Sequence, residues 1–151
     1  MDTDRALANV LPVTTAGPEE TREVGRRIAR ALAMESIIAL EGPLGAGKTE
    51  LVKGIADGAG LDGDAVSSPT FTVVHEYRGS GTILYHVDAY RVESEAELSE
   101  LGIEDVLYGE GWCVIEWPER LGRLLPPRAV RIRLEHRGAN HRHISLPAVP
   151  S

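Results

Sequence analysis

Several residue types are scarce in this chain of 151 residues, and each scarcity narrows what the protein can be. Cys113 is the single cysteine, which excludes an internal disulfide and suits a reducing compartment. No apolar run approaches the roughly 18 residues that a membrane-spanning helix needs, and nothing resembles a secretory signal. We therefore expect a soluble, cytoplasmic protein without a membrane partner. The length predicts one domain over residues 1–151, with a loose N-terminal end at 1–9.

Lysine is also nearly absent, since Lys48 and Lys53 are the only two among 16 basic residues. The formal net charge of −7 predicts a surface that repels a phosphate backbone, so direct, tight nucleic-acid binding is not expected. Arginines nevertheless crowd the last third of the chain: Arg120, Arg123, Arg128, Arg131, Arg133, Arg137 and Arg142. Their spacing fits either the solvated face of an antiparallel strand or a local basic patch.

Residues 42–49 read Gly-Pro-Leu-Gly-Ala-Gly-Lys-Thr and match the phosphate-binding P-loop spacing G-x-x-x-x-G-K-[ST] at every fixed position. Glycines let the backbone wrap a phosphate chain, and the N–H groups at a helix start form an anion-binding nest. Lys48 would reach the β- and γ-phosphates of a nucleotide, while packing against nothing itself, and the Thr49 hydroxyl would bind Mg²⁺. The predicted nucleotide-binding residues are Gly42, Leu44, Gly45, Ala46, Gly47, Lys48, Thr49 and Glu50.

Hydrophobic patterning around the P-loop predicts an α/β fold. The predicted strands span 10–15, 36–41, 71–77, 82–88, 112–115, 129–134 and 143–146, of which the last two form a hairpin. The predicted helices span 18–33, the segment from the P-loop to Gly58 or Gly60, 93–101 and 103–108. The buried strand before the loop and the helix after it are the context that a true P-loop requires.

Two carboxylates end predicted strands, which is where α/β sheets bind ligands. Asp88 closes the strand 82–88 and is expected to hold Mg²⁺ directly or through water, in the Walker B role. Glu116 follows the strand 112–115 and either binds the metal, orients the attacking water or simply faces solvent. Ala89 follows Asp88, so no adjacent glutamate is available to activate water, and the base must come from elsewhere.

Two further positions have alternative interpretations. Thr70 lies in the hydroxyl-rich segment Ser68-Pro69-Thr70 and either senses the γ-phosphate, as switch loops do, or belongs to an ordinary polar turn. Trp117 either packs on the core, shields the site or marks a partner surface.

Missing elements separate the classes of P-loop protein. The chain has no Asn-Lys-x-Asp segment, so guanine specificity is unsupported. A small-molecule kinase needs an acceptor-binding region and an arginine-bearing lid, for which the chain is short although its late arginines keep that class open. A nucleotide-gated binding module, with incidental turnover, is the other alternative.

Five segments together resemble the TsaE family, also called YjeE, over about residues 14–146. They are Leu44 to Thr49, Ser68 to Phe71, His86 to Arg91, Glu100 to Glu104, and Ile115 to Arg120. The resemblance implies a P-loop fold with a parallel central sheet, antiparallel strands at its margins and helices on both faces.

The resemblance also implies a function. Members of the family bind ATP and Mg²⁺ and hydrolyse ATP slowly, and they act with the TsaD and TsaB proteins, which form threonylcarbamoyladenosine in tRNA. Hydrolysis is thought to reset that complex, and contact with tRNA is left to the partners. Carried onto this chain, Lys48 would hold phosphates, Thr49 and Asp88 would serve Mg²⁺, Thr70 would take the switch-like place, and Glu116 would bind metal or position water.

The chain departs from the family at Glu50, where a second hydroxyl residue usually touches the α-phosphate. A carboxylate at this position repels phosphate unless it turns away. We therefore expect nucleotide affinity to be lowered by Glu50.

Overall fold

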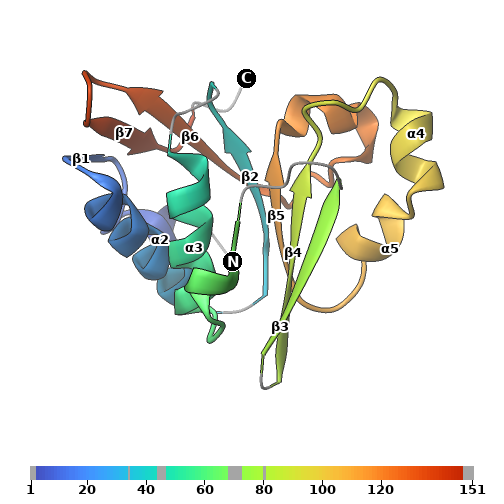
Figure 1. The fold of residues 1–151 in the computed structure, drawn as a ribbon, viewed down its shortest axis with the longest axis horizontal. Coiled ribbons are helices and arrows are strands. Elements are labelled where there is room, and N and C mark those ends of the chain that lie inside the picture. Colours follow the sequence, from blue (N-terminus) through green and yellow to red (C-terminus); the bar gives the residue numbers. More distant parts are fainter. Residues whose placement is uncertain (1–2, 34, 44–46, 68–72, 80, 148–151) are drawn as a thin grey trace.

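The structure is a computed structural model that describes residues 3–33, 35–43, 47–67, 73–79 and 81–147. Within these residues, seven strands form a sheet in the order β1-β7-β6-β2-β5-β4-β3 (Figure 1). The strands are β1 (Val13–Thr15), β2 (Ile37–Glu41), β3 (Val74–Gly79), β4 (Thr82–Asp88), β5 (Trp112–Glu116), β6 (Val130–His136) and β7 (Arg142–Ser145).

The centre of the sheet is parallel and its margins are antiparallel. Strand β2 pairs in parallel with both β5 and β6, and β5 pairs in parallel with β4. Strands β1, β7 and β3 join by antiparallel pairing at the two sides. Since residues 37–40 of β2 are buried, this strand is a near-continuous apolar run, as expected for a strand covered on both faces. The predicted sheet architecture is confirmed.

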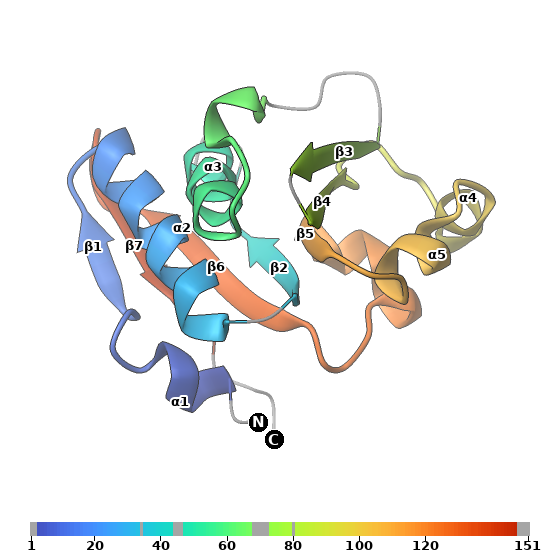
Figure 2. The same cartoon turned by 90° about the horizontal axis from the view of Figure 1, so that it is seen from below.

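Helices cover both faces of the sheet, as the resemblance implied. They are α1 (Thr3–Leu7), α2 (Pro18–Leu32), α3 (Lys48–Gly58), α4 (Glu95–Glu100) and α5 (Ile103–Leu107), with the 3₁₀ segments η1 (Gly63–Ala65) and η2 (Pro118–Leu124). In Figure 2, α2 and α3 lie against β6 and β2, whereas α4 and α5 lie on the other side of β4 and β5. No helix within the described ranges is long and apolar enough to cross a membrane.

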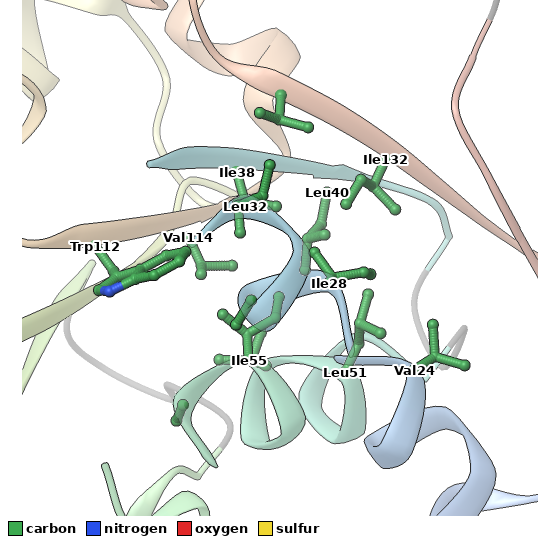
Figure 3. Packing of buried hydrophobic residues seen from close by; sticks show 14 of the residues in the cluster. Val24, Ile28, Leu32, Ile38, Leu40, Leu51, Ile55, Trp112, Val114 and Ile132 are labelled. Carbon is green, nitrogen blue, oxygen red and sulfur yellow. The ribbon is translucent and has the colours of Figure 1, made fainter. Parts of the chain in front are cut away.

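Two hydrophobic clusters hold these layers together. In the larger one, α2 and α3 turn apolar side chains toward the sheet (Figure 3); these include Val24, Ile28, Leu32, Leu51, Ile55, Ile38, Leu40, Val114 and Ile132. The smaller cluster lies on the opposite face and contains Ile37, Val87, Cys113, Ile115, Leu98, Ile103, Leu107 and Leu121. The sheet is therefore rigidly supported behind the ends of its central strands.

The structure differs from the expectation at the N-terminal end. Residues 3–7 form α1 rather than a loose end, and Leu7 is fully buried in the larger cluster. A short helix gains its stability from such burial rather than from its own hydrogen bonds, which sequence patterning does not reveal.

The late arginines on β6 follow the solvated-face interpretation. Arg131 and Arg133 point outward between the buried residues Val130, Ile132 and Leu134. Both arginines donate hydrogen bonds to the Glu41 carboxylate, at 3.1 and 3.2 Å.

Candidate nucleotide-binding site

The chain leaves β2 and enters α3 through backbone conformations that require glycine. Gly42 has φ +152°, and a Cβ at this position would lie 2.6 Å from the backbone oxygen of Leu134. Gly47 has φ +92° and immediately precedes Lys48, the first residue of α3. The strand, the glycine at each end of the loop and the following helix have the arrangement of a P-loop.

Part of the predicted site falls outside the described residues. Leu44, Gly45 and Ala46 lie there, and so does Thr70 with the rest of residues 68–72. Their assigned contacts with phosphate remain predictions.

Lys48 is buried in the structure, with only 5% of the residue exposed. Its Nζ donates a hydrogen bond to the backbone oxygen of Gly42 at 2.9 Å and lies 3.9 Å from Glu116 Oε1. The same ammonium sits 4.3 Å from the ring centroid of Trp117, a cation–π contact. The expectation that Lys48 packs against nothing is therefore wrong.

Burial and charge act on Lys48 in opposite directions. Burial lowers the pKa of its ammonium from the usual value, while the nearby carboxylates raise it; these are Glu116, Asp88 and Glu119. The structure thus brings a lysine and several carboxylates close together at the start of α3.

Asp88 and Glu116 lie side by side at one edge of the sheet. They are the last residues of β4 and β5, and they are register partners across that parallel pair. Asp88 Oδ1 accepts a hydrogen bond from the Tyr90 N–H at 3.0 Å, which fixes the turn after β4. Asp88 and Glu116 supply carboxylate oxygens, and Thr49, which follows Lys48, supplies a half-buried hydroxyl. These are hard ligands of the kind that Mg²⁺ takes together with nucleotide phosphates and water. Among the described residues, no group of three or more His, Cys, Asp and Glu side chains could hold a metal ion without such additional ligands, so the donor set fits Mg²⁺ bound with phosphates.

His86 is a member of this cluster that sequence reasoning missed. It is fully buried on β4, and its Nε2 lies 2.5 Å from Glu116 Oε2. The available signal was the alternation of β4, because residues 86 and 88 share one face of the strand.

Trp117 bridges the core and the site. It packs against the smaller hydrophobic cluster, contacts Lys48, and lies 4.9 Å from the ring of Tyr90. Its φ of +60° is a left-handed conformation that costs a bulky residue free energy, and such strain tends to occur at functional sites. The core-packing interpretation is therefore confirmed, and shielding of the site stays a prediction.

Glu50 lies in the first turn of α3. Its carboxylate is 3.6 Å from Lys53 Nζ, which partly offsets the negative charge. Glu50 also lines a hollow beside the P-loop together with Gly17, Pro18, Thr21, Gly47, Asn140 and Arg142.

Comparison with known proteins places this arrangement in a family. The family described as "Threonylcarbamoyl adenosine biosynthesis protein TsaE" matches residues 15–144. The chain is 38% identical over 135 residues to a Bacillus subtilis protein named "tRNA threonylcarbamoyladenosine biosynthesis protein TsaE", covering 89% of this chain and 84% of that one. It is 40% identical over 128 residues to a Treponema pallidum protein of the same name, covering 85% of this chain and 93% of the relative.

The fold agrees with a solved structure as well. The crystal structure of Bacillus subtilis YdiB superposes with a TM-score of 0.69 at 30% sequence identity, covering 91% of this chain and 86% of that one. The family match over most of the chain, the level of identity and the shared fold lead to one conclusion: this chain belongs to the TsaE family.

Proposed function

We propose that this protein binds ATP with Mg²⁺ and hydrolyses it slowly, in support of TsaD and TsaB proteins that form threonylcarbamoyladenosine in tRNA. The relatives are named for this biosynthesis, and the P-loop architecture supports nucleotide binding. Hydrolysis would reset the partner complex between turnovers, in the cytoplasm. Contact with tRNA would run through the partners, in keeping with the net charge of −7.

One observation carries the proposal: Lys48 lies within 3.9 Å of Glu116, beside Asp88, at the point where α3 begins. A buried ammonium and two carboxylates together suit a nucleotide that is bound with Mg²⁺. The ammonium would bind phosphate oxygens, and the carboxylates would bind the counter-ion of the same phosphates.

Each residue of the site would have its own role in binding the nucleotide and Mg²⁺. Lys48 would exchange its bond to Gly42 for the β- and γ-phosphates, and the N–H groups at the start of α3 would cradle the chain. Thr49, Asp88 and Glu116 would hold Mg²⁺, which when bound neutralises charge that develops on the phosphates. Thr70 would sense the γ-phosphate. The nucleoside would extend toward the hollow beside Gly47 and Glu50.

The kinase alternative has less support from the structure. A kinase lid needs arginines that are free to close over phosphates. Arg131 and Arg133 instead donate hydrogen bonds to Glu41. A gated binding module remains the other outcome, in which ATP binds without productive turnover.

ATP hydrolysis in the presence of Mg²⁺ tests the proposed site. Lys48→Met keeps an unbranched apolar side chain but removes the ammonium that contacts Trp117, and it should lower turnover about 100-fold, the usual loss when one donor to the transition state is removed. Glu116→Ala should lower turnover at least about 10-fold. The controls are Arg30→Ala and Glu110→Ala, which each remove an exposed charge elsewhere. Unchanged turnover in folded Lys48→Met would contradict the proposal.

A further inference from the structure

His86 occupies a position where a polar side chain is costly. It lies in the middle of β4 with no exposed surface, and its register partners are His75 on β3 and Val114 on β5. Leu84, two residues earlier on the same face, is an ordinary buried leucine.

The imidazole is only partly satisfied. One ring nitrogen, Nε2, donates a hydrogen bond to Glu116 Oε2 at 2.5 Å. The other ring nitrogen, Nδ1, is buried without a hydrogen-bond partner among the described residues. Such an unpaired atom costs roughly 1–3 kcal/mol, so stability alone does not explain histidine here.

The hydrogen bond from His86 occupies one carboxylate oxygen of Glu116, and the other oxygen faces Lys48. Oε2 is held by His86, while Oε1 faces Lys48 Nζ at 3.9 Å. Glu116 is 7% exposed, and among the described residues no hydrogen bond other than the one from His86 holds its carboxylate. His86 therefore decides which carboxylate oxygen points toward the start of α3.

We propose that His86 is a positioning residue that fixes the Glu116 carboxylate so that Oε1 is presented to the Mg²⁺ bound with the nucleotide. This inference rests on the proposed function, because it assigns His86 to the same site. Residues that orient a metal-binding carboxylate typically change metal affinity by 10- to 100-fold when they are replaced, roughly as much as some ligands do.

Nucleotide binding with and without Mg²⁺ tests the inference. A fluorescent ATP analogue is titrated in EDTA, and Mg²⁺ is then titrated at a fixed analogue concentration. His86→Leu should raise the half-saturating Mg²⁺ concentration about 10-fold or more and leave the affinity in EDTA within about twofold. His86→Gln, whose amide N–H can reach Glu116, should recover most of the Mg²⁺ response and also serves if His86→Leu does not fold.

A double-mutant comparison shows whether His86 acts through Glu116. In the Glu116→Gln background, replacing His86 by Gln or Leu should leave the already weakened Mg²⁺ response unchanged. An unaltered Mg²⁺ response in folded His86→Leu, or an equal loss in the presence and absence of Glu116, would overturn the inference. If the wild-type protein itself shows no Mg²⁺-dependent nucleotide binding, both the proposed function and this inference fail.

Discussion

At the scale of single residues, the site consists of side chains that are charged and yet buried. Lys48 and Glu116 are 5% and 7% exposed, and each buried charge costs several kcal/mol unless a specific partner offsets it. The backbone oxygen of Gly42 offsets the cost for Lys48, and His86 does so for Glu116. Phosphate and Mg²⁺ would supply stronger partners, which favours ligand binding at this position.

Glu50→Thr should tighten ATP binding by roughly fivefold, or about 1 kcal/mol, because it removes a carboxylate near the expected α-phosphate. Calorimetric titration with ATP and Mg²⁺ gives the dissociation constant. A dissociation constant that does not change would show that Glu50 turns fully away from the phosphates.

Lys53→Ala is the matched test of that prediction, because Lys53 Nζ lies 3.6 Å from Glu50 Oε1. If Lys53 offsets the Glu50 charge, Lys53→Ala should weaken ATP binding by roughly two- to threefold in the wild-type background. It should have no effect once Glu50 is threonine.

The residues of the P-loop could be predicted because the loop is one continuous segment, so the spacing of its fixed residues in the sequence identifies it. The partners of Lys48 could not, because Glu116 and Trp117 are distant in sequence and reach Lys48 only through the pairing of β2 with β5. His86 was missed because sharing one face of β4 with Asp88 does not by itself separate a site residue from a core residue.

At the scale of elements, α2 and α3 are held in unusually close contact by small residues. A Cβ added to Gly54 on α3 would collide with the backbone oxygen of Arg22 on α2, and one added to Gly25 would collide with that of Leu51. Apolar periodicity predicted both helices and their buried faces. It could not predict the distance between them, because that distance depends on which glycines face each other.

Gly54→Ala should destabilise the protein by about 3 kcal/mol, since the two helix backbones must separate to admit the methyl group. Urea unfolding measures the change in the free energy of unfolding. Gly17→Ala is the control, because nothing lies within 4 Å of a Cβ there, and it should cost no more than about 1 kcal/mol. Equal effects of the two substitutions would contradict the close packing.

A charge cluster also links the two helices. Asp57 on α3 accepts hydrogen bonds from Arg22 at 2.8 Å and Arg26 at 3.0 Å on α2, and from the Gly63 N–H at 2.9 Å. The bond from Arg22 is the chief reason that the pKa of the Asp57 carboxyl lies below its usual value of 3.8, and the bonds from Gly63 and Arg26 add to it. Asp57→Asn should therefore cost about 2 kcal/mol at neutral pH.

The pH dependence of that cost has a definite sign. Because the folded-state pKa of Asp57 is lowered, its contribution to stability is complete above the unfolded value of 3.8 and is lost as the pH falls through the lowered value. The difference in unfolding free energy between wild type and Asp57→Asn should thus be constant near neutral pH and shrink below about pH 4. A difference that grows on acidification would contradict this role.

At the scale of the whole molecule, the strand order gathers the site from distant segments. Strands β2, β5 and β4 are neighbours and parallel, so their carboxyl ends lie at the same end of the sheet (Figure 1). The P-loop begins after β2, and Glu116 and Asp88 are the last residues of β5 and β4. The overall fold could be predicted because strands alternate with helices around the P-loop. The N-terminal helix and the exact strand ends could not, because tertiary packing decides them.

The most direct measurement is the rate of ATP hydrolysis with Mg²⁺, in the presence and absence of the matching TsaD and TsaB proteins. The proposed function predicts slow turnover by the protein alone, a clear rise with both partners, and loss of that rise in Lys48→Met and Glu116→Ala. If the partners change nothing and phosphate passes instead to an added small-molecule acceptor, the partner-dependent ATPase is contradicted and a kinase replaces it.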